Sequence, residues 1–186
     1  MIATEVTSPF LTPFKLSLVL AVFVAMPVIL AQLWGFIAPG LYKSEKRIAI
    51  PLLTSSVILF YAGVAFAYYV VFPLLFGFFT TVGPGDISVM TDINRYLDFV
   101  LKLFFAFGLA FEVPVAAVIL ILTGVVTADQ LANNRSYVIV GCFVMGMLLT
   151  PPDVISQTLL ALPMWLLFEV GLVMGRVLSR SPNEDE

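Results

Sequence analysis

Two long apolar runs without a single charge limit what this chain can fold into. Residues 16–37 and residues 48–79 contain no Asp, Glu, Lys or Arg. A helix needs roughly 17–25 mainly apolar residues to cross a bilayer, so each run predicts a transmembrane helix. The second run is longer than a bilayer requires, and we expect it to tilt, to bend near Pro73 or to protrude.

The composition of the whole chain supports a membrane environment. The chain is 61% hydrophobic and 11% charged, whereas soluble domains carry about 25% charged residues. The net charge is −3 without a long basic block, so we expect no nucleic-acid partner. Histidine is absent and Cys142 is the only cysteine. We therefore expect no catalytic residues, metal site or cofactor, and Cys142 is expected to pack as a small apolar residue.

The rest of the chain contains three further candidate spans. Residues 103–126 form one, interrupted by Glu112 and extended at its start to a helix cap at Thr91 or Asp92. Two adjacent prolines divide the last two, which are short, because proline cannot continue a helix. The predicted fold is an all-α polytopic integral membrane helix bundle in a single domain, residues 1–178, followed by a cytoplasmic tail, residues 179–186. Its five transmembrane helices are expected at about 14–37, 48–79, 92–126, 136–150 and 154–175.

The distribution of lysine and arginine predicts the orientation of the bundle. Five spans leave six of these cations on one side of the membrane and three on the other. Because cytoplasmic loops are enriched in Lys and Arg, residues 36–47, residues 127–135 and the C-terminus are expected in the cytoplasm. If the last two segments formed a re-entrant hairpin, the loops and the C-terminus would lie on the same sides of the membrane. Residue 1 would then lie outside, and we infer that a preceding helix is missing from this chain.

Glu112 is the most unusual side chain inside a predicted span. A charge at the bilayer centre costs about 2.5–3.5 kcal/mol on insertion scales, so this carboxyl group is expected to be neutral, to face a polar cavity or to meet a partner. Pro114 removes the hydrogen bond to the carbonyl group of Ala110 and loosens the helix nearby. The pattern fits polar contact between helices of this chain, a site for a partner helix or substrate, or a proton relay.

Three other groups of residues allow two interpretations each. Glu45, beside Lys46 and Arg47, is either a surface carboxylate or an acceptor for an incoming guanidinium, which can bind a carboxylate through two hydrogen bonds. Asp153 is either the cap of the last helix or, with Thr150 and Gln157, a polar contact for another helix. The Gly-x-x-x-Gly spacing at 171–175 is a weak signal for close helix packing.

Three motifs together resemble one known family. They are Phe36-x-x-x-Pro39-x-Leu41-Tyr42-x-x-Glu45, Phe111-Glu-Val-Pro114 and Met147-Leu-Leu-Thr-Pro-Pro-Asp153, in this order. The chain to about residue 178 is similar to TatC, the multispanning subunit of the Sec-independent twin-arginine protein translocase. This resemblance implies a multi-pass protein of the bacterial cytoplasmic (inner) membrane, with six transmembrane helices in the family and its second to sixth present here.

The resemblance also implies a function and roles for particular residues. The family recognises twin-arginine signal peptides and exports folded proteins with energy from the proton-motive force. Glu45 would accept the arginine pair, and Phe36, Pro39, Leu41 and Tyr42 would belong to the same signal-peptide-binding surface. Glu112 and Pro114 would form an intramembrane polar site.

Further contacts implied by the resemblance involve other subunits. Met147, Thr150, Gln157 and Asp153 would contact the single-span partners TatA and TatB. The complex is expected to hold several copies of this chain. We also expect the short last helices to thin the surrounding lipid bilayer.

A proton-coupled small-molecule transporter with Glu112 as the proton carrier is the competing interpretation. Such transporters usually contain repeats with helices broken near the midplane. We find no repeat, and the sharpest break lies near a predicted membrane surface. A membrane-embedded enzyme fits less well, because the sequence offers no catalytic pair.

Overall fold

The computed structural model describes residues 8–37, 46–82, 92–150 and 153–180, and most of these residues are helical. In chain order the elements are α1 (Ser8–Ile37), α2 (Lys46–Phe66), the π-helical turn η2 (Ala67–Val71), α3 (Phe72–Val82), α4 (Ile93–Ala110), α5 (Val113–Leu122), α6 (Ala128–Asn133), α7 (Arg135–Leu149) and α8 (Val154–Arg180). Four stretches within them are long and apolar enough to cross a membrane: Phe10–Leu33, Ile50–Phe79, Ile93–Leu122 and Val154–Ser179.

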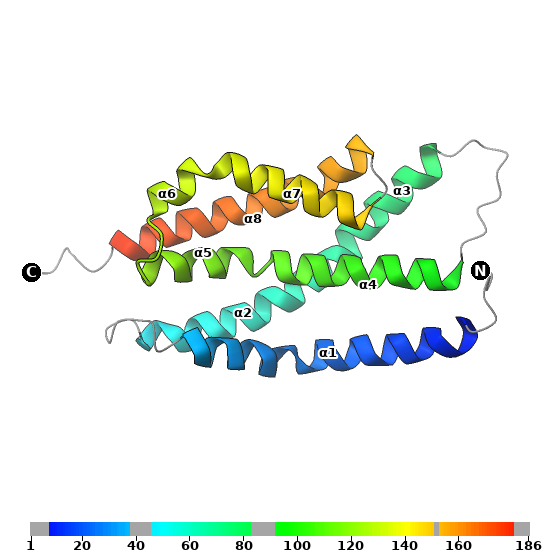
Figure 1. Cartoon of the computed structure of the whole chain (residues 1–186), viewed down its shortest axis with the longest axis horizontal. Helices are drawn as coiled ribbons and strands as arrows, with labels where there is room; N and C mark the ends of the chain where they lie inside the picture. The colour runs from blue at the N-terminus through cyan, green and yellow to red at the C-terminus, as the bar shows by residue number, and fades with distance from the viewer. Residues whose placement is uncertain (1–7, 38–45, 83–91, 151–152, 181–186) are drawn as a thin grey trace, which may run out of the picture.

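The long helices run side by side along the length of the bundle (Figure 1). α1 ends, α2 begins, and α5 and α8 end at one end of the bundle, which we call the C-terminal end. α1 and α4 begin, and α3 ends, at the opposite end. α5 and α8 therefore run parallel, and they make the most extensive contact between any two helices described.

Two buried clusters hold the bundle together. The larger joins α4 to η2, α3 and α8 through fully buried side chains that include Phe107, Leu103, Leu75 and Leu160. The smaller joins α1 to α2 through side chains packed around Phe60. Many large apolar side chains remain exposed on the outer surface of the bundle, as expected where lipid replaces water as the solvent.

The second span changes its hydrogen-bonding pattern just before Pro73. Proline has no N–H to donate, and the amide of Phe72 donates to the carbonyl oxygen of Ala67, five residues earlier. This π-type turn separates α2 from α3, and the combined helix crosses the bundle obliquely in Figure 1. The expected irregularity near Pro73 is therefore present, one turn earlier than the proline itself.

The C-terminal half agrees with one expectation about helix length and corrects another. α7 is short, with 15 residues, but α8 has 27 residues and continues past Glu169 and Arg176 to Arg180. Both charges are paired. Glu169 binds Arg135 through two contacts of 2.7 Å, and Arg176 forms an ion pair with Asp129 at 3.1 Å. These ion pairs accommodate both charges, and the helix continues to Arg180, beyond the expected end at residue 175.

α6 was not expected from the sequence. This short helix begins with a capping box, in which the Thr127 hydroxyl accepts from the Gln130 amide and the Gln130 side chain accepts from the Thr127 amide. The spacing Thr-x-x-Gln is the signal that could have identified it. Just before it, the third span ends at Leu122, and Gly124 follows with φ +70°.

Candidate functional site

The residues predicted to bind a signal peptide fall mostly outside the described part of the chain. Pro39, Leu41, Tyr42 and Glu45 lie outside it, and Phe36 lies in the last turn of α1 without a described side chain. The helices on either side are described. α1 ends at Ile37 and α2 begins at Lys46, both at the C-terminal end of the bundle (Figure 1).

Glu112 lies where the third span is interrupted. α4 ends at Ala110 and α5 begins at Val113, with Pro114 in its first turn. The Glu112 amide donates to the carbonyl of Leu109, three residues back, at 3.0 Å, and its carbonyl accepts from Ala116 at 2.9 Å. The break follows from the missing N–H of Pro114, as the sequence predicted, and it places a carboxyl group at a helix junction deep in the bundle.

Ser56 on α2 is the partner of this carboxyl group. The Ser56 hydroxyl donates to Oε2 of Glu112, and Ser56 is only 1% exposed. The other carboxyl oxygen, Oε1, is buried and has no hydrogen-bond partner among the described residues. Glu112 is thus anchored on one side and retains one unused acceptor.

The role of Ser56 was not predicted from the sequence. It belongs to a run of three hydroxyl residues, and the first two donate to carbonyl groups of their own helix: Thr54 to Ile50 and Ser55 to Leu52. Only Ser56 makes its bond to another helix. Its position four residues before the fully buried Phe60 places it on the inward face of α2, and this helical spacing is the signal that could have identified it.

Two glycines bring α2 and α4 close together beside this pair. A Cβ atom on Gly63 would collide with the backbone of Phe107, and one on Gly108 would lie 2.6 Å from Phe60 Cε2. On the neighbouring side a groove of about 360 Å³ opens between α2, α5 and α8, and Ser55, Phe111 and Pro114 contribute to its wall. The polar pair therefore lies next to a mainly apolar groove that is shared by three helices.

The glycines of the Gly-x-x-x-Gly segment pack within this chain. A Cβ atom on Gly171 of α8 would lie 2.5 Å from Pro114 Cα, and one on Gly175 would meet the end of the Ile121 side chain. Both contacts are on α5. α8 therefore packs directly on the turn that follows Glu112, which explains the extensive contact between these two parallel helices.

The four residues predicted to contact a partner helix have different environments. Met147 is half exposed on α7, and Gln157 is partly buried on α8. Thr150 is only 5% exposed, and its hydroxyl donates to the carbonyl of Gly146 at 3.0 Å. Asp153 accepts from the amide of Ser156 at 2.7 Å, so the predicted cap of the last helix is confirmed.

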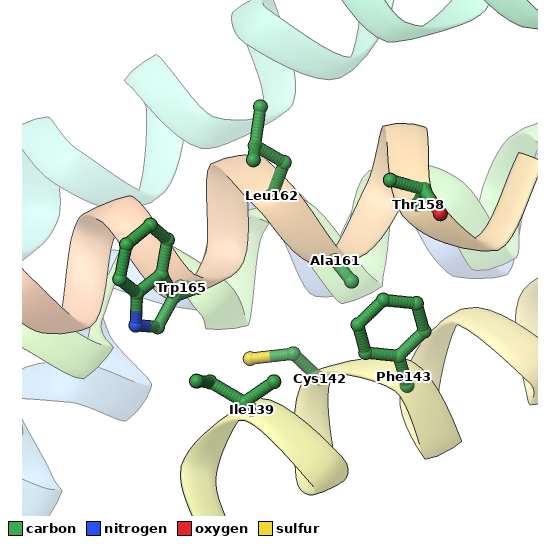
Figure 2. Close-up of a pocket in the computed structure, with 7 residues that line it drawn as sticks. All are labelled: Ile139, Cys142, Phe143, Thr158, Ala161, Leu162 and Trp165. Atoms are coloured by element: carbon green, nitrogen blue, oxygen red, sulfur yellow. The ribbon is translucent and has the colours of Figure 1, made fainter. Parts of the chain in front are cut away.

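Met147 therefore presents its side chain on the surface and Gln157 is partly buried, while Thr150 caps the end of α7 and Asp153 caps the start of α8. A small apolar cavity of about 140 Å³ lies between the same two helices (Figure 2). α7 contributes Ile139, Cys142 and Phe143, and α8 contributes four residues that include Ala161 and Trp165. The buried indole nitrogen of Trp165 has no acceptor among the described residues. Such a lining fits an aliphatic or aromatic group far better than an ion.

These features define a class of protein: a multi-pass membrane bundle with a hydroxyl–carboxyl pair at a broken helix and an apolar surface on its last two helices. Comparison with known proteins specifies the family. Residues 1–163 match the family described as Sec-independent protein translocase protein (TatC). This chain belongs to the TatC family, and it is a subunit of a Tat translocase in the inner membrane.

Individual relatives agree with this assignment. The chain is 69% identical over 94% of its length to the TatC protein of Azotobacter chroococcum mcd 1, covering 69% of that protein. It is 55% identical over its full length to TatC of Escherichia coli strain K12, covering 72% of that protein. A crystal structure of the twin-arginine translocase receptor TatC superposes with a TM-score of 0.86 at 42% identity, covering 97% of this chain and 79% of that one.

Proposed function

We propose that this chain is the receptor subunit of a twin-arginine translocase, and that it binds signal peptides with two adjacent arginines through Glu45. Membership of the TatC family carries this proposal. A carboxylate suits the task because a planar guanidinium binds it through two hydrogen bonds. Phe36, Pro39, Leu41 and Tyr42 complete the proposed binding surface.

The arrangement of the described helices supports this position for the receptor surface. α1 ends and α2 begins on either side of the Glu45 segment, at the same end of the bundle as the end of α8. The excess of Lys and Arg assigns that end to the cytoplasm, where unexported cargo is present. The C-terminus of this chain is therefore proposed to be cytoplasmic.

The remaining steps of export involve other subunits. The surface that includes exposed Met147, partly buried Gln157 and the α7–α8 cavity is proposed to contact the single transmembrane helices of TatA and TatB. Thr150 and Asp153, which cap the adjoining helix ends, are proposed to belong to the same contact region. Glu112 would provide a polar group within the membrane for a later step. Folded cargo would cross with energy from the proton-motive force, in a complex that holds several copies of this chain.

A crosslinking experiment tests the receptor proposal. A photoreactive amino acid at Tyr42 should crosslink a twin-arginine signal peptide in membranes that contain this chain. Changing Arg-Arg to Lys-Lys in the peptide should weaken the crosslink, because a lysine ammonium cannot make the paired hydrogen bonds. Glu45→Gln should reduce it about tenfold or more, as expected for the loss of a charge-assisted pair worth at least 1.5 kcal/mol.

Asp129→Asn provides the control, since it removes a carboxylate from α6 at the same end of the bundle. It should leave the crosslink unchanged. An equal crosslink with the Lys-Lys peptide, as expected if this chain were instead a small-molecule transporter, would contradict the proposal. Full binding by Glu45→Gln would reject Glu45 as the acceptor.

A further inference from the structure

Three charged side chains, Lys15, Asp98 and Lys102, line one groove near the starts of α1 and α4. Lys15 of α1 donates from Nζ to Oδ1 of Asp98 on α4, and Lys102 lies one helical turn further along α4. Lys102 is exposed and makes no ion pair within the described ranges. Asp98 is paired with Lys15, so the positive charge of Lys102 is left without a neutralising carboxylate among the described residues.

The position of Lys102 makes this surplus charge unusual. The residue lies ten positions after the cap at Asp92, or about 15 Å along the helix at 1.5 Å per residue. It falls within an apolar stretch that is long enough to cross a membrane. Side chains on a helix tilt toward its N-terminus, so the Lys102 ammonium can extend toward the nearer membrane surface while its methylene groups stay in apolar surroundings.

A groove begins at these charges and continues along apolar side chains. It encloses about 420 Å³ between α1, α4 and α7, and Lys15, Asp98 and Lys102 line it together with Phe105, Leu109 and Met145. Ala106, Leu109 and Met145 also line a second groove of about 390 Å³, which continues along α4 and α5 toward Phe168 of α8. The two grooves adjoin at these three residues, so together they give an elongated, mainly apolar surface with the charged group of Lys15, Asp98 and Lys102 at one end.

We propose that this groove binds one anionic phospholipid, with its phosphate on Lys102 and an acyl chain lying between α4 and α7. The ligand and the groove match in charge and in polarity. A phosphodiester supplies the single negative charge that Lys102 lacks, and an acyl chain needs apolar walls without hydrogen-bonding groups. A free phosphate would leave the apolar length empty, and a basic peptide would be repelled by the surplus positive charge.

The lipid headgroup is expected to influence binding. Phosphatidylglycerol is anionic, whereas the choline group of phosphatidylcholine carries a cation that competes with Lys102 for the same phosphate. We therefore expect the groove to prefer phosphatidylglycerol when the acyl chains are identical. This preference does not depend on the proposed recognition of signal peptides, because no residue near Glu45 takes part.

Native mass spectrometry of the detergent-purified chain measures this binding directly. Phosphatidylglycerol and phosphatidylcholine with the same acyl chains are titrated separately. The unaltered chain should retain phosphatidylglycerol with the higher apparent affinity. Lys102→Gln should weaken that binding about fivefold, as expected for one lysine at a membrane surface, and Lys102→Arg should restore it.

Arg95→Gln is the matched control. Arg95 is another exposed cation of α4, one turn before Asp98. It lines a separate polar pocket with Lys15 and Asp98, but it does not line the groove that contains Lys102. It should leave the affinity unchanged. Met145→Trp tests the apolar part, because a larger side chain in the groove should displace the acyl chain and weaken binding of both lipids.

Several results would overturn the proposal. They include equal affinity for the two lipids, an equal loss in Arg95→Gln, or no retained phosphatidylglycerol. Equal protection from thermal unfolding by glycerol phosphate would indicate a site for free phosphate instead. If Lys102→Gln weakened binding of a single-span subunit but left lipid binding intact, the groove would belong to a protein partner.

Discussion

At the scale of single residues, Glu112 shows how a costly side chain is accommodated in the bundle. The sequence indicated a carboxyl group in a span and a weakened helix at Pro114, and both are present. It did not identify Ser56, because a serine in an apolar run has no signature of its own apart from its position on the helix. The contact depends on how two distant segments pack, which a single sequence does not reveal.

Replacing Ser56 should destabilise the bundle. Ser56→Ala leaves Glu112 without its one observed side-chain donor, and an unsatisfied buried polar group costs about 1–3 kcal/mol. Thermal unfolding in detergent, followed by tryptophan fluorescence, measures the change. The effect of Ser56→Ala should become smaller in a Glu112→Leu background, where no carboxyl group remains to be satisfied.

Ser55→Ala is the natural control for this measurement. The Ser55 hydroxyl donates within its own helix, to the carbonyl of Leu52 at 2.7 Å, so its loss should have little effect. Equal losses for Ser55→Ala and Ser56→Ala would show that the contact with Glu112 adds no stability.

At the scale of helices, the contact between α5 and α8 determines how the C-terminal half packs. The Gly-x-x-x-Gly spacing was a weak signal, and the structure shows that it is used against Pro114 and Ile121 within the chain. The apolar runs predicted where most helices lie. They could not predict α6 or the full length of α8, because the ion pairs of Asp129 and Glu169 form only when separate helices meet.

Substitution of the two glycines should have graded effects on stability. Gly171→Ala would force a methyl group against the backbone of Pro114, whereas Gly175→Ala meets only the end of a flexible side chain. Overpacking typically costs about 1–3 kcal/mol, so we expect Gly171→Ala to lie in this range and Gly175→Ala below it. Thermal unfolding of the purified variants measures both.

Gly141→Ala on α7 supplies the reference, because nothing lies within 4 Å of the added methyl group. It should be neutral or slightly stabilising, since alanine favours helix more than glycine does. A larger loss for Gly175→Ala than for Gly171→Ala would contradict the described packing.

At the scale of the whole molecule, the helices differ in how much of a bilayer they can cross. The 15 residues of α7 extend about 22 Å, compared with about 30 Å of hydrocarbon in a typical bilayer. The end of α7 and the start of α8 stop short of the end of α3 and the start of α4 in Figure 1. Because α7 is shorter than the neighbouring helices, we expect the lipid bilayer beside it to be thinner.

The thickness of the bilayer should therefore affect stability. In nanodiscs, we expect the chain to unfold at a higher temperature in dimyristoyl than in dioleoyl phosphatidylcholine, because the thinner bilayer reduces the mismatch at α7. Lengthening α7 by one apolar turn should reduce this difference. A higher unfolding temperature in the thicker bilayer for the unaltered chain would refute the role assigned to α7.

The contact of Gly171 with Pro114 has a mechanical consequence. Without a side chain between the two backbones, the last helix cannot rotate about its axis or slide without pushing on the kink that carries the Glu112 carboxyl group. A partner that binds the exposed side of α8 and moves this helix would therefore also displace the segment that carries Glu112, through the contact at Gly171.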